Sequence, residues 1–138
     1  MKVSAKLKNV KGGMSMNYEW LDEYLLSKLG VTKDFKEEWE WDRYLLNGKM
    51  IAAICTDKTG KEIITLKCEP SFGEELRIQY EDIIPGYYMN KVHWNSVYLE
   101  GEVPDEVIKD MIDQSYELIF NKLSKKMQNE IRNGDKND

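Results

Sequence analysis

The residues best suited to binding chemistry lie close together near position 93. Lys91, His93, Trp94 and Asn95 bring a positive charge, hydrogen-bonding groups and a large aromatic ring into one short run. A lysine can contact a phosphate, an indole can stack on a base, and an amide can hydrogen-bond to one, so the run suits nucleic acid. The same residues also suit a structural corner, in which Trp94 fills the core and His93 donates to a backbone carbonyl. His93 is the only histidine, which excludes a histidine-rich metal site.

Three further basic residues extend this candidate site. Lys49 and Lys67 lie near the ends of two predicted strands, and Arg77 lies in a predicted helix. If the two strands are neighbours, both lysines border one surface with Arg77 and Lys91 and form a local basic patch. Lysines at strand ends also protect sheets against edge-to-edge pairing, which is the alternative explanation.

Acidic residues gather in the first third of the chain. A weak metal site is one interpretation, since hard cations prefer clustered oxygen ligands, and an ordinary solvated face is the other. The candidate ligands are Glu19, Asp22, Glu23, Glu38, Glu40 and Asp42. The sequence contains neither a GxSxG nucleophile motif nor a glycine-rich phosphate loop. We therefore expect neither an enzyme nor a bound cofactor.

Charge is distributed unevenly along the 138 residues. The formal net charge is −5, and residues 1–15 contain four lysines and no acidic residue, so residues 16–138 carry −9. Because phosphate contacts dominate affinity for nucleic acids, a site on this acidic body has to be a local basic patch. No stretch reaches the roughly 20 apolar residues of a membrane span, and no apolar signal segment follows the first lysines. The two cysteines, Cys55 and Cys68, have no CxxC spacing, which favours packed free thiols in the cytoplasm over a disulfide.

Hydrophobic periodicity predicts the elements that position these residues. Three- and four-residue steps between apolar side chains predict a helix capped by Asn17 and ended by Gly30. Alternation from Glu38 predicts an exposed strand with one aromatic face. Asn47-Gly48 is typical of a type I′ hairpin turn, so this strand and the next two form a meander. The two further strands are 49–55 and 62–68.

The second half of the chain predicts two helices and a fourth strand. Ser71 and Glu74 fit a capping box, which starts a helix reaching about residue 80. Residues 95–100 alternate as a strand, and Val103-Pro104-Asp105-Glu106 opens the last helix. The apolar stripe of that helix is Ile108, Met111, Ile112, Ser115, Ile119 and Leu123.

This order of elements predicts the fold class and the domain organisation. Helices and strands that are segregated in this way indicate an α+β fold, an antiparallel sheet with helices packed on one face. We expect a flexible basic leader at 1–15, a single domain at 16–125, and a polar tail at 126–138 that frays. We expect the protein to be a monomer.

Residues 83–99, IIPGYYMNKVHWNSVYL, strongly resemble the MmcQ/YjbR family of small bacterial proteins. Val103-Pro104-Asp105-Glu106 and the residues 114–118, QSYEL, match the final helix of that family, and the resemblance covers about residues 17–125. It implies a CyaY-like, frataxin-like α+β fold that is described as a double-wing DNA-binding domain. In a frataxin-like fold, a ridge formed by the six acidic candidate ligands would imply weak iron binding.

Three functional hypotheses follow from these observations. The first is a non-enzymatic DNA-binding protein of the MmcQ/YjbR type, which would contact DNA through Lys49, Lys67, Arg77, Lys91, His93, Trp94 and Asn95. The second is a small-molecule or metal-binding module with no role in nucleic-acid binding. The third is a protein-interaction domain that recognises its partner through Trp39 and Trp41.

Overall fold

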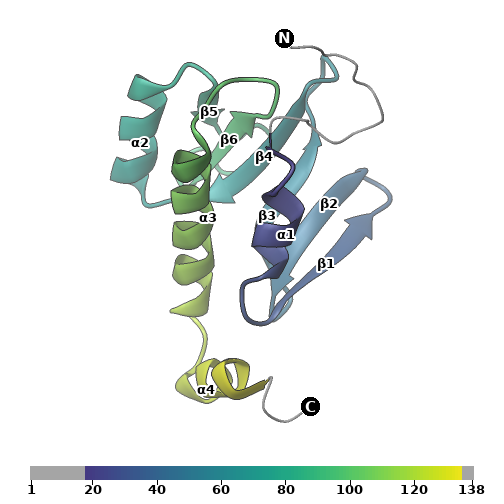
Figure 1. Cartoon of the computed structure of the whole chain (residues 1–138), viewed down its shortest axis with the longest axis vertical. Helices are drawn as coiled ribbons and strands as arrows, with labels where there is room; N and C mark the ends of the chain where they lie inside the picture. The colour runs from purple at the N-terminus through teal and green to yellow at the C-terminus, as the bar shows by residue number, and fades with distance from the viewer. Residues whose placement is uncertain (1–17, 135–138) are drawn as a thin grey trace.

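The computed structural model of the chain describes residues 18–134, which are built around one antiparallel sheet (Figure 1). The spatial order of the strands is β1-β2-β3-β4-β6-β5. Strands β2, β3 and β4 form the predicted meander, and Asn47 and Gly48 have the positive φ of a type I′ turn, at 51° and 78°. The strands are β1 Val31–Lys36, β2 Trp41–Leu46, β3 Lys49–Thr56, β4 Glu62–Lys67, β5 Ile83–Pro85 and β6 Trp94–Tyr98.

Helices pack on one face of this sheet, which confirms the predicted α+β class (Figure 1). The predicted stripe of α3 is buried against β3 and β4 from Ile108 to Ile119. On α2, Arg77 donates to the buried side chain of Asn95 in β6, which places α2 on the same face. The helices are α1 Leu21–Leu26, α2 Pro70–Gln79, α3 Asp105–Phe120 and α4 Lys125–Asn133.

A serine within the apolar stripe of α3 joins that helix to the sheet. Ser115 Oγ donates to the carbonyl of Ile51 at 2.6 Å and accepts from the Lys67 N–H at 3.0 Å. The β2–β3 register shifts at this point, because Tyr44 pairs with Ala52 while the next residue pairs with Met50. The hydroxyl therefore satisfies backbone groups where the ladder is irregular.

The N-terminal helix is shorter than predicted. Helix α1 ends at Leu26 rather than beside Gly30, and Val31–Lys36 forms the edge strand β1, which the sequence pattern did not indicate. Gly30 has a φ of 83° at the junction, and a Cβ there would lie 3.1 Å from Ile131. The predicted cap at Asn17 and the predicted leader at 1–15 lie outside the described residues.

The predicted strand from Glu38 begins only at Trp41. Residues 37–40 form a turn, in which the N–H groups of Trp39 and Glu40 both donate to the carbonyl of Lys36. Glu40 has a φ of 59°, a left-handed conformation that ends β1 and reverses the chain. The alternation of acidic and aromatic residues therefore belongs to a turn, and it places Trp39 at the tip.

The C-terminal segment, expected to be a fraying polar tail, forms helix α4. Ser124 caps this helix by accepting from the Met127 N–H at 3.1 Å. Gln128 is buried, and its Nε2 donates to the carbonyls of Phe120 and Leu123 at 3.2 and 3.0 Å. The helix is therefore joined to the end of α3 by its one buried side chain, that of Gln128. Residues 135–138 lie outside the described range.

Helix α2 also starts differently from the prediction. Pro70 is its first residue and Glu69 occupies the N-cap position, with no side-chain cap bond. Ser71 is already inside the helix, so the predicted capping box with Glu74 is wrong. The proline explains the difference, because its fixed φ favours the first helical position.

Helices α1, α2 and α3 leave the other face of the sheet uncovered, and the loop 86–93 between β5 and β6 crosses part of it. The Tyr87 N–H donates to Ser96 Oγ on β6 at 3.1 Å, and the Tyr88 hydroxyl donates to the carbonyl of Thr56 on β3 at 2.9 Å. The loop thus reaches from β6 to β3 and leaves β2 open. Within residues 18–134, we find no helix with the length and apolar character to span a membrane.

Candidate functional site

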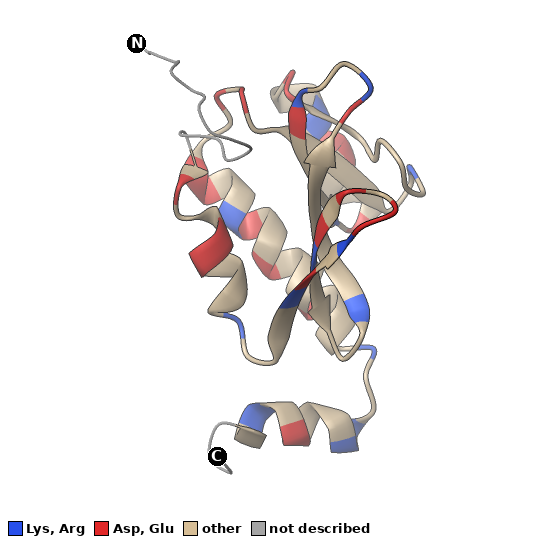
Figure 2. Ribbon diagram, turned by 90° about the vertical axis from the view of Figure 1, so that its right-hand side faces the viewer, with Lys and Arg blue, Asp and Glu red and all other residues tan. Residues whose placement is uncertain are grey.

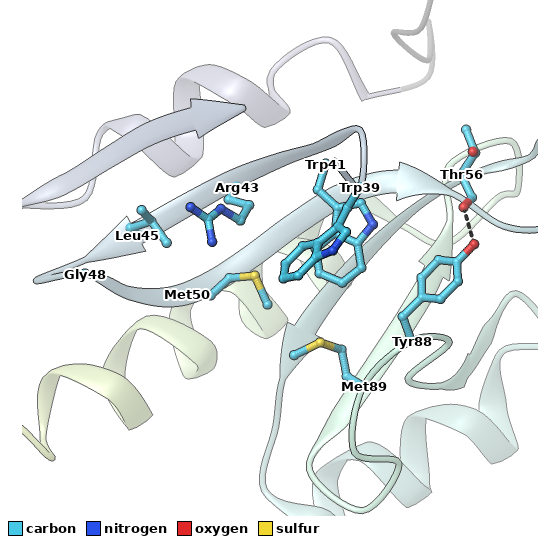
Figure 3. Close-up of a pocket in the computed structure, with 9 residues that line it drawn as sticks. All are labelled: Trp39, Trp41, Arg43, Leu45, Gly48, Met50, Thr56, Tyr88 and Met89. Atoms are coloured by element: carbon cyan, nitrogen blue, oxygen red, sulfur yellow. Dashed lines mark hydrogen bonds between the residues drawn. The ribbon is translucent and has the colours of Figure 1, made fainter. Parts of the chain in front are cut away.

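A pocket of about 670 Å³ lies on the open face of the sheet, between strands β2 and β3 and the loop 86–93 (Figure 3). Its wall is aromatic on two sides, where the side chains of the β1–β2 turn approach those of the loop. Methionine and leucine side chains, together with Arg43, Gly48 and Thr56, line the remainder. The lining residues are Trp39, Trp41, Arg43, Leu45, Gly48, Met50, Thr56, Tyr88 and Met89.

Three aromatic rings of this pocket lie in a row, with Trp41 between Trp39 and Tyr88. The ring centroids of Trp39 and Trp41 are 5.0 Å apart, and those of Trp41 and Tyr88 are 5.8 Å apart. Trp39 is 54% exposed and Tyr88 is 44% exposed. Folded proteins normally bury such rings, so a cluster that stays exposed around a concave surface marks an interaction site. We call Trp39, Trp41 and Tyr88 the aromatic row.

The loop side of the pocket is held in place by hydrogen bonds between side chains and the backbone. Lys91 Nζ donates to the carbonyl of Gly86 at 2.6 Å, and the Lys58 N–H donates to the Tyr87 hydroxyl at 3.2 Å. A Cβ on Gly86 would lie 2.9 Å from the Cβ of Trp94, so only glycine allows this close approach. Tyr88 is therefore presented to the pocket by a loop with fixed ends.

Acidic side chains outnumber basic ones beside the pocket. The guanidinium of Arg43 binds both carboxylate oxygens of Asp34, at 2.9 and 2.6 Å, and this pairing lowers the pKa of Asp34. The turn 37–40 carries three exposed glutamates around Trp39, and it appears as a red loop in Figure 2. The neighbouring cation is Lys36, whose Nζ lies 5.3 Å from the Trp39 ring centroid. The rim of the pocket is therefore acidic.

The four residues near position 93 do not form one surface. Lys91 binds loop carbonyls, His93 is exposed, and Trp94 is half-buried. Asn95 is fully buried on the helix-covered face, where its Oδ1 accepts from Arg77. The side chains of Arg77 and Asn95 are thus engaged with each other inside the fold.

The predicted basic residues Lys49 and Lys67 do lie at the same end of the sheet. Antiparallel pairing of β3 and β4 places the start of one strand beside the end of the other. Lys122, which follows α3, approaches Lys67, and burial together with this second ammonium lowers the pKa of Lys67. Across residues 18–134, no ion pair involves Lys49, Lys67 or Lys122. We call these three residues the lysine end.

The acidic candidate ligands are spread over separate places. Asp22 accepts from Lys33 and from the Tyr44 hydroxyl, which lowers its pKa. Glu38 and Glu40 lie in the turn, and Asp42 follows in β2. In the described part of the chain, no three His, Cys, Asp or Glu side chains are grouped closely enough to hold a metal ion.

Sequence reasoning identified Trp39 and Trp41 but missed their partners. Tyr88 and Met89 come from a segment without regular periodicity, and Met50 is one apolar residue within an apolar strand. The signal that could have found the loop is Pro85-Gly86 followed by two tyrosines, since a turn beside exposed rings is unusual.

Comparison with known proteins agrees with this architecture. The family model YjbR matches residues 26–118. Bacillus subtilis protein YyaQ is 44% identical over 109 residues, which are 78% of this chain and 87% of that protein. Escherichia coli K12 protein YjbR is 30% identical over 108 residues, 78% of this chain and 91% of that protein. Both carry the description uncharacterized.

Solved structures share the fold. A crystal structure of the Deinococcus radiodurans protein DR2400, with a DUF419 domain, superposes with a TM-score of 0.71 at 29% identity and covers 80% of this chain and 84% of that one. A crystal structure of a Pseudomonas syringae protein superposes with a TM-score of 0.65 at 26% identity. The match covers 75% of this chain and 98% of that one. The molecule is a small α+β protein with a helix-covered antiparallel sheet. It belongs to the YjbR family.

Proposed function

We propose that this protein is a non-enzymatic binding protein whose aromatic pocket holds a small organic molecule. The aromatic row carries the proposal, because two exposed rings, Trp39 and Tyr88, and the half-buried ring of Trp41 line one cavity of about 670 Å³. That volume lies within the roughly 300–1,000 Å³ of typical ligand pockets, which are lined mainly by apolar and aromatic side chains. The cytoplasm is the expected location, and the buried free thiols of Cys55 and Cys68 suit a reducing compartment.

The contacts of the pocket support binding rather than catalysis. Arg43 and Tyr88 are the two lining residues with titratable side chains. The guanidinium of Arg43 is bound to Asp34, and the hydroxyl of Tyr88 donates to the carbonyl of Thr56. Both groups are thus already engaged in structural contacts, which favours a role in binding over one in proton transfer.

Indole N–H resonances provide the direct test. The chain has four tryptophans, and two of them line the pocket. A titration with a panel of ring compounds such as indole, adenosine and benzyl alcohol should shift the signals of Trp39 and Trp41 and leave those of Trp20 and Trp94 in place. Trp41→Leu should abolish the shift at Trp39, whereas Ile78→Ala, at a remote residue that is 86% exposed, should not. A panel that moves none of the four signals would refute the proposal.

DNA binding is a second candidate, and the lysine end favours it. Two ammonium groups that approach each other without a described carboxylate partner attract an anion such as a phosphate. Lys67 also pairs across β4 and β6 with Trp94, which is half-buried and adjoins the exposed His93. The DNA-binding role that the resemblance implied therefore stays a prediction, now centred on Lys49, Lys67 and Lys122.

Fluorescence anisotropy with labelled duplex and single-stranded DNA tests this candidate. Two phosphate contacts should weaken binding roughly tenfold between 50 and 200 mM salt. Replacing Lys67 and Lys122 together with glutamate should abolish binding, whereas Lys58→Glu in the β3–β4 turn should have a small effect. Binding that disappears only when residues 1–15 are removed would assign it to that basic segment and contradict a site on the lysine end.

A further inference from the structure

The chemistry of the pocket points to a particular class of ligand, an inference that rests on the proposed function. Residues 34–43 contain five acidic and two basic side chains, which leaves a local charge of −3 around Trp39 and Trp41. Within that segment the positive charge of Arg43 is matched by Asp34, which binds it through two oxygens. Glu37, Glu38 and Glu40 are exposed on the turn that carries Trp39, where Glu38 pairs with Lys36 at 3.8 Å. The pocket therefore attracts cations and repels anions at its mouth.

The aromatic row supplies a second reason for a cation. The faces of indole and phenol rings carry partial negative charge, and a cation is held when it lies within about 6 Å of a ring centroid. Trp39 already holds one ammonium in this way, because Lys36 Nζ lies 5.3 Å from its centroid. In Figure 3 the indoles of Trp39 and Trp41 face the space that Tyr88 and Met89 approach from the loop.

The lining also limits the kind of cation. None of the nine lining residues has a carboxylate, and the hydroxyls of Thr56 and Tyr88 are the two side-chain oxygen acceptors among them, too few for the three donors of an ammonium or the five of a guanidinium. A primary ammonium or a guanidinium would leave buried N–H donors without acceptors, and unpaired buried donors are costly. A quaternary ammonium has no N–H group, and its methyl groups would contact Met50, Met89 and Leu45.

From these observations we infer that the aromatic pocket binds a small free quaternary ammonium compound. Cation–π contacts with Trp39, Trp41 and Tyr88 hold the charged group, and apolar contacts with the two methionines hold its methyl groups. The glutamates of the turn 37–40 raise the local concentration of the cation. A phosphate next to the ammonium is disfavoured by the same glutamates, which argues for a free cation rather than a phosphocholine headgroup.

Four chemically related compounds test the inference by calorimetry and by the indole N–H signals. Choline is the quaternary cation, 3,3-dimethylbutan-1-ol is its neutral isostere, ethanolamine is a primary ammonium, and phosphocholine adds an anion. Choline should bind roughly three- to thirty-fold more tightly than the neutral isostere, the range expected from cation–π attraction. Ethanolamine and phosphocholine should both bind more weakly than choline.

Variants identify the groups that recognise the charge. Trp41→Leu and, on a different element, Tyr88→Leu keep an apolar side chain but remove a ring face, so each should reduce the preference for choline over its isostere. Trp41→Phe should retain part of it. Replacing Glu37, Glu38 and Glu40 together with glutamine should lower the affinity for choline and leave the affinity for the neutral isostere unchanged. Ile78→Ala is the control that should change neither.

The outcomes separate this inference from the proposed function. Equal affinity for choline and its neutral isostere would overturn the cation inference and leave a pocket for uncharged molecules. Failure of choline while the ring compounds still shift Trp39 and Trp41 would also overturn it and leave the proposed function standing. Absence of any shift with all of these compounds would refute both. Tighter binding of phosphocholine than of choline would overturn the assignment to a free cation.

Discussion

On the helix-covered face of the sheet, Ile64, Leu66 and Val97 are fully buried, whereas on the open face Trp41 and Tyr88 line a pocket that solvent reaches. The two faces belong to the same strands, so the difference arises from what packs against them. Helix α3 lies over β3 and β4 on the first face, while on the second the loop 86–93 stops before β2. One face therefore stabilises the fold, and the other is free to bind.

The largest change in stability is expected from a substitution in the core of the helix-covered face. Ile112→Ala removes a fully buried side chain of α3, and we expect a loss of about 2–5 kcal/mol in the free energy of unfolding. Urea denaturation measures the change. Ile78→Ala on the exposed side of α2 should stay within about 0.5 kcal/mol of the parent. Similar losses for the two variants would contradict the assignment of the core to this face.

A smaller effect is expected where α3 is tied to the sheet by a hydroxyl. Ser115→Ala leaves the Lys67 N–H and the Ile51 carbonyl without that partner, which should cost about 1–3 kcal/mol. Ser71→Ala, at an exposed serine of α2, is the matched control and should have little effect. If thermal and urea unfolding give equal free energies of unfolding for both variants, the hydrogen bonds of the Ser115 hydroxyl do not stabilise the fold.

The covered face also carries a half-buried acid, Glu62, that makes stability depend on pH. Burial, with smaller contributions from Glu100 and Asp42, raises the pKa of Glu62 to about 7. The folded state therefore holds this proton more tightly than the unfolded state, and the stabilising contribution present at low pH is lost as the pH rises from about 4.5 to about 7. Glu62→Gln should be more stable than the parent at pH 8 and similar to it at pH 4. Melting temperatures of both proteins between pH 4 and pH 8 check the expectation, and equal values at pH 8 would contradict it.

The smallest change in stability is expected from a substitution on the open face of the sheet. Trp39→Ala removes a ring that is more than half exposed, so the free energy of unfolding should change by no more than about 1 kcal/mol. Ligand-induced shifts of the Trp41 indole N–H should nevertheless weaken strongly. A large loss of stability in this variant would mean that Trp39 belongs to the folding core rather than to the pocket.

The covered face could be predicted well from the sequence. The three- and four-residue spacing from Ile108 to Ile119 identifies the buried side of α3 directly, because a helix brings those residues to one side. Asn47-Gly48 defines the β2–β3 hairpin through its positive φ angles. Strand β1 was missed because an edge strand pairs on one side, and the segment VTKDFK is mostly exposed, so it lacks an alternating apolar pattern.

The pocket could be predicted only in part. Trp39 and Trp41 stood out as aromatic residues among acids, but their spacing also fits a strand, and only the left-handed Glu40 reveals the turn. Tyr88 lies more than 40 residues further along the chain and reaches the pocket because β6 pairs with β4, in addition to its sequence neighbour β5. A local pattern cannot encode such a meeting, and the same holds for Lys122 beside Lys67.

The packing of α4 has a consequence for the order of folding. Ile131 lies against Gly30 at the junction of α1 and β1, and the Tyr116 hydroxyl donates to the carbonyl of Leu29 at 2.7 Å. Closing a loop of about 100 residues carries a large entropic cost, so this contact should form late, after the local hairpins of β2, β3 and β4. During synthesis the β2–β3–β4 meander can assemble early. The contact between Gly30 and Ile131 can form only after α4, the last helix of the described residues, has left the ribosome.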